Sequence, residues 1–409
     1  MKRISLLIPA FLLLGGNTLA QTLKIHSGQV TVAIPASQAG TMNYGAGGAT
    51  LSVMGRTYDT SEIDSITVDR TPVENGTVSV RYNGGKAHVT VTGDIAPHLN
   101  VTAQAADVSV IAGADLQTEV VYRLSGTSSD GSFFMDGEFK ATVELDGLDL
   151  TSNRGAAIDI ANGKRINIIL KDGTTTTLAD GAGGTQKACL FVNGHAEFSG
   201  TGTLLLTGNS RHAYASDEYT LLKPGLGMLR VLKAANDGLH VDQYFKMQGG
   251  TVDINNTKGD CIDVSVTKDP LDECNGQAFV EGGTLTMNVA AEDIKGLKTE
   301  NQLTISGGSV KATVSGNGSK GISAGTDLVI EQNTATQTRI EMTVTGTTYM
   351  PGDALLESKC RGIKVKGNFT FDGGDIRISA TGAKSKAISV DGRYIYKKGT
   401  LNCPVDSAL

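Results

Sequence analysis

The chain repeats a short pattern at intervals of about 25 residues, and this repeat constrains its fold more than any other feature. An apolar anchor that follows a small residue recurs in six segments: "NDGLHVD" (236–242), "GDCIDVS" (259–265), "IKGLKTE" (294–300), "SKGISAG" (319–325), "CRGIKVK" (360–366) and "SKAISVD" (385–391). A second strand-like segment follows many anchors and carries a Gly-Gly pair, as in "AFVEGGTLTM" and "LTISGGSVKA". A repeat of this length is one supersecondary unit that cannot bury its apolar face alone.

Alternation of apolar and polar residues within these segments excludes helical repeats, because helices need a period of 3.6. Propeller blades need about 40–45 residues per repeat, which is nearly twice the length found here. We therefore predict an all-β fold, a right-handed parallel β-helix in which each coil holds two or three short strands. Equivalent residues on successive coils should stack about 4.8 Å apart. The Gly-Gly pairs should mark corners that need positive φ.

The start of the chain predicts export. Lys2 and Arg3 precede an apolar run over 4–14, and small residues follow, as in a secretory signal peptide over residues 1–20. We expect a secreted protein, located in the periplasm or at the cell surface. The later sequence contains no stretch of the roughly 20 apolar residues that a membrane span needs.

Residues 21–76 do not share the repeat and predict a small β-rich N-terminal region or cap, with the β-helix covering 77–409. The net charge of −6 gives no case for a nucleic-acid partner. We expect a monomer. Of the five cysteines, Cys261 and Cys274 are the best candidates for a disulfide, whereas the apolar context of Cys189 and Cys261 favours buried free thiols.

Acidic side chains gather near three consecutive anchors. Stacking of the coils should bring them to one corner of the solenoid, where their oxygens could hold Ca²⁺, which takes six to eight oxygen ligands. The predicted metal ligands are Asp237, Asp242, Asp260, Asp263, Glu292 and Asp293. The six histidines show no metal-ligand spacing, and His240 is interpreted as an exposed turn residue.

Basic side chains replace the acidic ones farther along. Like charges on paired strands are destabilising, so a basic column needs acidic partners or a polyanionic ligand. The predicted glycan-binding residues are Lys295, Lys298, Lys320, Arg361, Lys364 and Lys386. Ordinary salt-bridged turn residues are the alternative.

Several longer segments carry a family resemblance. "GAAIDIANGKRINIILKDGTTTTLADG", "GTGTLLLTGNSRHAYAS" and "ANDGLHVDQYFKMQGGTVDI" resemble the exported bacterial carbohydrate-binding, calcium-binding parallel β-helix family, over roughly residues 120–405. The resemblance implies a polysaccharide-lyase-like fold, bound calcium, and adhesion to plant polysaccharides such as pectate or cellulose. Calcium ligation carries over only to the acids of "NDGLHVD", "GDCIDVS" and "AEDIKG". The later Lys and Arg columns depart from the family pattern.

Three functions remain open from the sequence. The first is non-catalytic, calcium-assisted binding of an acidic plant glycan such as pectate, favoured over cellulose because the chain has no tryptophan for stacking on sugars. The second is a calcium-dependent polysaccharide lyase, with Lys295 or Lys298 as the base. The third is a structural or adhesive surface protein without a specific glycan.

Overall fold

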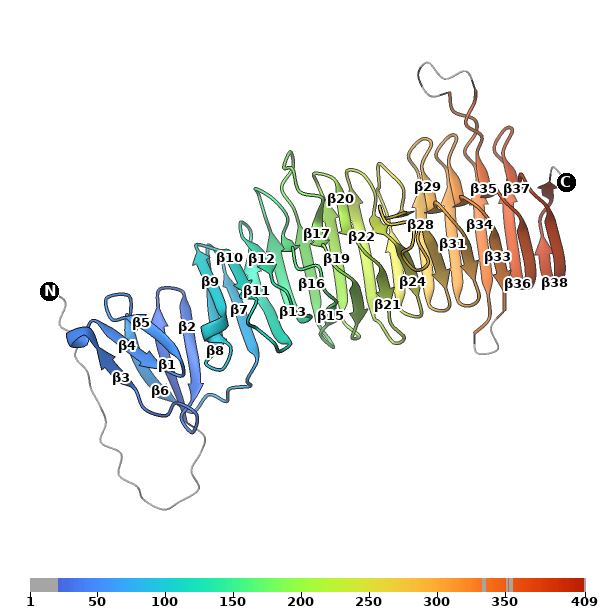
Figure 1. The fold of residues 1–409 in the computed structure, drawn as a ribbon. Helices are drawn as coiled ribbons and strands as arrows, with labels where there is room; N and C mark the ends of the chain where they lie inside the picture. Colours follow the sequence, from blue (N-terminus) through green and yellow to red (C-terminus); the bar gives the residue numbers. More distant parts are fainter. Residues whose placement is uncertain (1–20, 333–335, 351, 353–355, 408–409) are drawn as a thin grey trace.

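The computed structural model describes residues 21–332, 336–350, 352 and 356–407. Within these residues the regular structure is β-strand apart from two short 3₁₀ turns, η1 (Ala46–Gly48) and η2 (Ala96–His98). Figure 1 shows an elongated solenoid with a separate β-rich region at its N-terminal end. The predicted signal peptide lies outside the described residues. None of the helical segments in the described part has the length and apolarity that crossing a membrane requires.

Within the N-terminal region the strands pair in the antiparallel sense. Its strands are β1 (Thr22–Ser27), β2 (Val30–Pro35), β3 (Asn43–Gly45), β4 (Thr50–Val53), β5 (Arg56–Asp59) and β6 (Ser65–Asp69). Strand β1 pairs with β2 and β6, and β4 pairs with β3 and β5. Strand β2 also pairs in parallel with β8 (Lys86–Thr92), which joins this region to the sheet of the solenoid. The parallel coils begin with β7 (Thr77–Asn83), which pairs in parallel with a strand of the next coil.

The first coils are built from longer strands. They are β7 (Thr77–Asn83), β8 (Lys86–Thr92), β9 (Leu99–Gln104), β10 (Asp107–Ala112), β11 (Val120–Ser128), β12 (Ser132–Asp136) and β13 (Ala141–Thr151). Two antiparallel hairpins, β7–β8 and β9–β10, start the solenoid before regular coils take over.

Three parallel ladders then run the length of the solenoid. The first ladder continues β10 and β12 with β14 (Ile158–Ile160), β17 (Ala188–Val192), β20 (His212–Ser216), β23 (Leu239–Asp242), β26 (Ile262–Ser265), β29 (Lys295–Thr299), β32 (Lys320–Ala324), β35 (Arg361–Val365), β37 (Lys386–Val390) and β39 (Val405–Ser407). The second ladder contains β15 (Ile166–Leu170), β18 (Ala196–Ser199), β21 (Thr220–Leu222), β24 (Tyr244–Met247), β27 (Gln277–Val280), β30 (Leu303–Ile305) and β33 (Leu328–Glu331). The third ladder contains β16 (Thr175–Ala179), β19 (Thr203–Gly208), β22 (Met228–Ala234), β25 (Thr251–Ile254), β28 (Thr284–Val289), β31 (Ser309–Val314) and β34 (Arg339–Val344).

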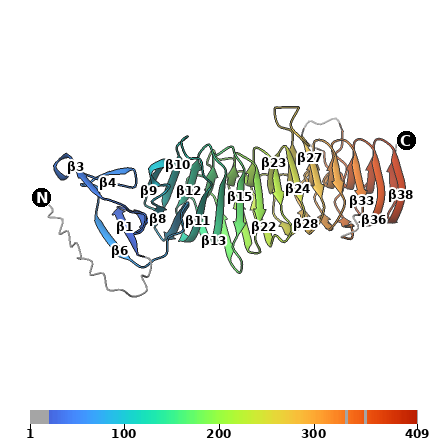
Figure 2. The same ribbon diagram turned by 60° about the horizontal axis from the view of Figure 1, so that its bottom comes forward.

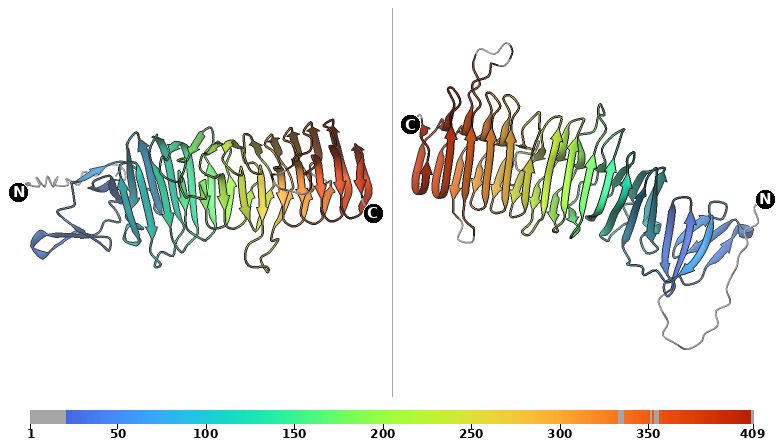
Figure 3. Two further views of the ribbon diagram at one scale, coloured as in Figure 1. Left: turned by 90° about the horizontal axis from the view of Figure 1, so that it is seen from above. Right: turned by 180° about the vertical axis from the view of Figure 1, so that it is seen from behind.

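Two long strands join the second and third ladders near their ends. Strand β13 pairs with both β15 and β16, and β36 (Phe369–Ala380) pairs with both β33 and β34. The last strand of this sheet is β38 (Tyr394–Asn402). Figure 3 shows the stack of coils from two further sides, with the N-terminal region at one end. The predicted parallel β-helix is thus confirmed, with three strands in each regular coil.

The apolar anchors form one buried column inside the first ladder. Register partners on successive coils are Leu239, Ile262, Leu297, Ile322, Ile363 and Ile388. All six side chains are buried. The residue directly after each anchor points outward, because side chains alternate along a strand. Successive coils therefore stack because equivalent positions carry similar apolar side chains.

The Gly-Gly pairs turn the corner between the second and third ladders, as predicted. The second glycine has a positive φ at Gly250, Gly283 and Gly308, of 82°, 83° and 77°. Between β26 and β27 an inserted loop leaves the coil and projects from the solenoid (Figure 2).

The cysteines correct one prediction. All five lie in the described part of the chain, and none is paired, so the expected Cys261–Cys274 disulfide is wrong. Cys261 is fully buried against Thr257 and the backbone carbonyl of Asn288. The interpretation of Cys189 and Cys261 as buried free thiols is confirmed.

Candidate functional site

Stacking of the first ladder brings predicted metal ligands and two histidines to one place. We call this cluster the His–Asp corner: His212, Asp237, His240, Asp242, Asp260 and Asp263. Asp237 Oδ1 accepts the backbone N–H of Asp260 at 2.7 Å, and Asp260 Oδ1 accepts that of Lys295 at 2.7 Å. One oxygen of each of these carboxylates therefore holds the next coil in place.

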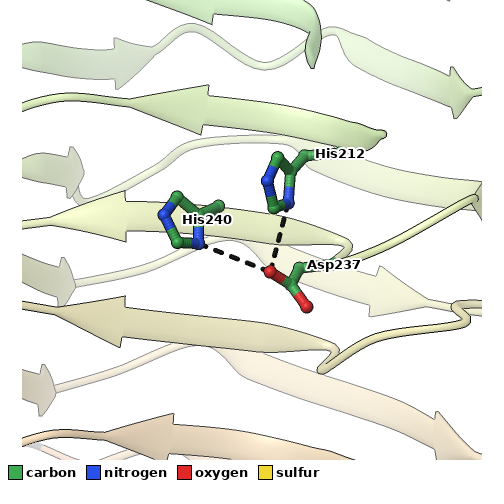
Figure 4. A group of neighbouring side chains, drawn as sticks. All are labelled: His212, Asp237 and His240. Atoms are coloured by element: carbon green, nitrogen blue, oxygen red, sulfur yellow. Dashed lines mark ion pairs between the residues drawn. The ribbon is translucent and has the colours of Figure 1, made fainter. Parts of the chain in front are cut away.

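The other oxygen of Asp237 faces both histidines. Its Oδ2 lies 3.1 Å from His212 Nδ1 and 3.4 Å from His240 Nδ1 (Figure 4). His240 Nδ1 also lies 3.2 Å from Asp263 Oδ2, and its Nε2 lies 3.6 Å from Asp242 Oδ1. Both Nδ1 atoms are buried, and neither makes an aligned hydrogen bond with any described residue.

Burial and close charges perturb the titration of this corner. Burial lowers the pKa of His212. Burial alone would also lower the pKa of His240, but Asp237 and Asp263 raise it to about 9. Burial raises the pKa of Asp260 to about 6, and it raises that of Asp242 as well. Burial is the largest cause of both shifts, so these two carboxylates lie in a partly desolvated site, whereas the pKa values of Asp237 and Asp263 are lowered, despite burial, by their histidine and lysine partners.

The structure corrects the interpretation of His240. This residue lies on strand β23, and its side chain is only 27% exposed, so it is not an exposed turn residue. His212 lies 28 residues earlier and is 2% exposed. The absence of metal-ligand spacing along the chain was misleading, because stacking of the coils sets the distance between these rings.

The six predicted metal ligands do not form one shell. Among the described residues, one group of three or more potential ligands has its ligand atoms within 4.8 Å of one another, and it consists of His212, Asp237 and His240. Asp293 instead contacts Lys320 Nζ at 3.1 Å, and Glu292 is exposed.

Lys298 already occupies the oxygen-rich side of the His–Asp corner. Its Nζ lies 2.9 Å from Asp263 Oδ1 and 3.7 Å from Asp260 Oδ2. Burial alone would lower the pKa of Lys298, but Asp263 and Asp260 raise it above its ordinary value. The side chain is therefore held as an ammonium ion.

The predicted basic columns do stack, since Lys295, Lys320, Arg361 and Lys386 are register partners on successive coils. Lys295 Nζ donates to the backbone carbonyl of Asp293 at 2.7 Å. Arg361 is only 6% exposed and donates to the backbone carbonyl of Cys360.

The remaining bases have carboxylate partners. Lys364 pairs with Asp391, and Lys386 pairs with Asp406. Each of the six predicted bases thus has a partner inside the chain, which leaves little unpaired positive charge on this face.

A groove of about 490 Å³ lies on the third ladder, toward the C-terminal end. Its lining residues come from β28, β31, β34, β36 and β38. One side is a column of register partners, Thr286, Lys311, Glu341, Arg377 and Asn402. The other side is the column Thr313, Thr343 and Ser379. Because each column crosses from strand to strand, the groove runs along the axis of the solenoid.

Polar groups in this groove are free to meet a ligand. Within the described residues, the hydroxyls of Thr313, Thr343 and Ser379 make no hydrogen bond, and no carboxylate lies within 4 Å of Lys311 Nζ. Arg377 Nη2 lies 2.8 Å from Asp375 Oδ2, yet its side chain is 54% exposed. The third ladder therefore offers the unpaired donors that the first ladder lacks.

The groove was not predicted from the apolar anchors, although the sequence carries a signal for it. Thr286, Lys311 and Arg377 are each the third residue after a Gly-Gly pair. Aligning the segments on these pairs would have shown the column, whereas alignment on the apolar anchors shows the first ladder.

Aromatic rings stack along the second ladder, which the sequence also did not reveal. Tyr219 stacks on His195 at 4.4 Å and on Tyr244 at 4.7 Å between ring centroids. Both faces of Tyr219 are therefore covered by protein rings, and this side chain does not offer a free face to a sugar.

Comparisons with known proteins agree with the fold. A family model described as "Carbohydrate-binding domain-containing protein" matches residues 106–350. A protein of that description from Acetivibrio thermocellus is 29% identical over 99 residues, which is 22% of this chain and 35% of that protein. The chain thus matches about a third of the length of that relative.

A solved structure supports the fold alone. It is that of the polysaccharide lyase-like protein from C. thermocellum, determined as a gadolinium derivative. The match has a TM-score of 0.51 and 22% sequence identity, and it covers 64% of this chain and 99% of that one. Since the family model matches more than half of the sequence, the chain belongs to the family of carbohydrate-binding domain-containing proteins.

Proposed function

We propose that this chain binds a polysaccharide without cleaving it, and that the polymer lies along the groove of the third ladder. The observation that carries the proposal is that the hydroxyls of Thr313, Thr343 and Ser379 and the ammonium group of Lys311 have no partner among the described residues. An extended polymer can contact all five strands of the groove. Repeated weak contacts along one chain add up by raising the effective concentration of each next contact.

An acidic glycan fits this groove better than a neutral one. Lys311 is exposed and has no carboxylate within ion-pair distance among the described residues. Arg377 is also exposed and presents a planar fork suited to carboxylates. Glu341 lies between them in the same column, so the charges alternate along the groove. A uronate polymer such as pectate supplies both the carboxylates and the hydroxyls for such a surface.

The lyase alternative is less well supported. β-Elimination needs a base that can accept a proton, and the raised pKa of Lys298 opposes that role. Lys295 is held by the backbone carbonyl of Asp293. A purely adhesive protein without a specific glycan remains the alternative that a binding experiment decides.

Calcium assistance and export stay predictions from the sequence. Calcium prefers a shell of six to eight oxygens. The His–Asp corner mixes carboxylates with two imidazoles, and Lys298 Nζ already lies 2.9 Å from Asp263. This donor set fits calcium poorly, and the groove contacts proposed here do not require a metal.

We expect substitutions in the groove of the third ladder to weaken polysaccharide binding much more than a substitution on the first ladder. Replacing Lys311 and Arg377 together with alanine should weaken binding to polygalacturonate at least about tenfold, because two hydrogen bonds to charged groups are lost. The matched control is Lys364→Ala on the first ladder, which removes a cation paired with Asp391 and should change the affinity less than about twofold. Affinity electrophoresis or calorimetry at fixed ionic strength measures both variants.

The reverse result, with Lys364→Ala weakened and the double variant unchanged, would move the binding face to the first ladder. Equal binding by all three proteins would contradict an acidic ligand in the groove. Parallel samples with calcium and with chelator test calcium assistance, and we expect the groove-dependent binding to persist in chelator. Growth of ultraviolet absorbance from unsaturated products would establish a lyase instead.

A further inference from the structure

The His–Asp corner contains two buried nitrogens that the protein leaves without a hydrogen bond. His212 is 2% exposed, and its Nδ1 faces Asp237 Oδ2 at 3.1 Å without the alignment of a hydrogen bond (Figure 4). His240 Nδ1 also faces Asp237 Oδ2, at 3.4 Å, and likewise lacks the alignment of a hydrogen bond. A buried polar atom without a partner is costly, so it calls for an explanation.

Both imidazole contacts to Asp237 Oδ2 are short, yet neither is aligned as a hydrogen bond. A neutral ring can present a lone pair at Nδ1, and Asp237 Oδ2 also presents lone pairs. Two such atoms 3.1 Å apart repel unless a proton or a cation lies between them. Asp237 Oδ1 is already used by the backbone N–H of Asp260, so Oδ2 is the oxygen left for a cation.

The separations match those of ligands around a small divalent metal. The distances are 3.1 Å and 3.4 Å from Asp237 Oδ2 to the two imidazole Nδ1 atoms, and all three ligand atoms lie within 4.8 Å of one another. Ligands at about 2.0–2.2 Å from a tetrahedral zinc ion lie roughly 3.3–3.6 Å apart. Imidazole nitrogen together with carboxylate is a donor set that zinc and its transition-metal neighbours prefer, whereas calcium selects oxygen.

We propose that the His–Asp corner binds one divalent transition-metal ion of the zinc type through His212 Nδ1, Asp237 Oδ2 and His240 Nδ1. These ligands come from two successive coils, at β20, β23 and the turn before β23. The ion therefore joins coils that are otherwise held by backbone hydrogen bonds and apolar stacking. The side chain of His240 is 27% exposed, so an ion can reach the site from solvent on this side.

The test titrates purified, chelator-treated and dialysed protein with Zn²⁺ and, separately, with Ca²⁺, by calorimetry and by thermal unfolding, without any glycan. We expect one Zn²⁺ per chain, a rise in the unfolding temperature with Zn²⁺, and no comparable effect of Ca²⁺. Co²⁺ in place of Zn²⁺ should give the visible absorption of a tetrahedral site. His240→Ala should weaken Zn²⁺ binding by more than the roughly 10–100-fold that loss of an outer-shell partner costs.

The matched control is His98→Ala, which removes an exposed histidine paired with Asp115 and should leave Zn²⁺ binding unchanged. Failure of the wild-type protein to bind Zn²⁺ stoichiometrically would overturn the proposal. So would His240→Ala with unchanged affinity, or Ca²⁺ binding that Zn²⁺ cannot displace. None of these outcomes depends on glycan binding.

Discussion

Replacing Phe245 with alanine is expected to lower the free energy of unfolding by about 3–5 kcal/mol, the range for emptying a buried aromatic site. Phe245 is fully buried on β24, and its register partners on the adjacent coils are the small residues Thr220 and Ala278. These neighbours leave the space that the ring fills, and neither can extend into it. Chemical denaturation followed by far-ultraviolet circular dichroism measures the change.

Phe279→Ala is the matched control, because Phe279 lies on the outer face of the next strand, β27, and is only partly buried. Its loss should cost about 1 kcal/mol, the central value for a point substitution. A cost for Phe245→Ala no larger than that of the control would show that the coil collapses around the gap or that the ring is not part of the core.

Gly283→Ala is expected to lower the free energy of unfolding by roughly 2–5 kcal/mol, from a strained φ and a steric clash together. Gly283 has a φ of 83°, and a Cβ there would lie 2.5 Å from the backbone carbonyl oxygen of Gly250 on the preceding coil. Neither coil can move away without breaking the ladder. The same denaturation experiment measures the effect.

Gly225→Ala separates the two causes. Gly225 has a similar φ of 78°, but a Cβ added there meets nothing within 4 Å. This control should cost only about 1–2 kcal/mol, the strain of the left-handed conformation. Equal losses for the two variants would mean that the coils do not approach each other as closely at Gly283 as the structure has it.

The repeat made the fold predictable because a β-helix stacks identical positions. The anchors Leu239 and Ile262 were aligned from the sequence, and they are register partners in the structure. The corner glycines followed from the same alignment, since a sharp turn between stacked coils needs positive φ. The apolar anchor and the corner glycines that mark one coil in the sequence therefore also mark the next coil.

The candidate sites were less predictable, for physical reasons. The outward columns were found, but pairing of a base with an acid depends on side-chain direction, as in the contact of Lys298 with Asp263. The approach of His212 and His240 depends on the turn that places Asp237 between them. The groove was missed because its residues are in phase with the Gly-Gly pairs and not with the apolar anchors.

The spacing of the five strands fixes the spacing of the groups that a polymer in the groove would contact. Adjacent parallel strands lie about 4.8 Å apart, so its two end strands are separated by roughly 19 Å. A polymer whose repeat differs from the strand spacing by about 0.5 Å is displaced by about 2 Å at the far end, well beyond the roughly 0.5 Å range of hydrogen-bond lengths. If a polysaccharide lies along the groove as we propose, a column such as Thr286 to Asn402 would select it by the length of its repeat as well as by its charge. Oligomers too short to span the groove would escape this selection, and discrimination between glycans should sharpen as the chain lengthens.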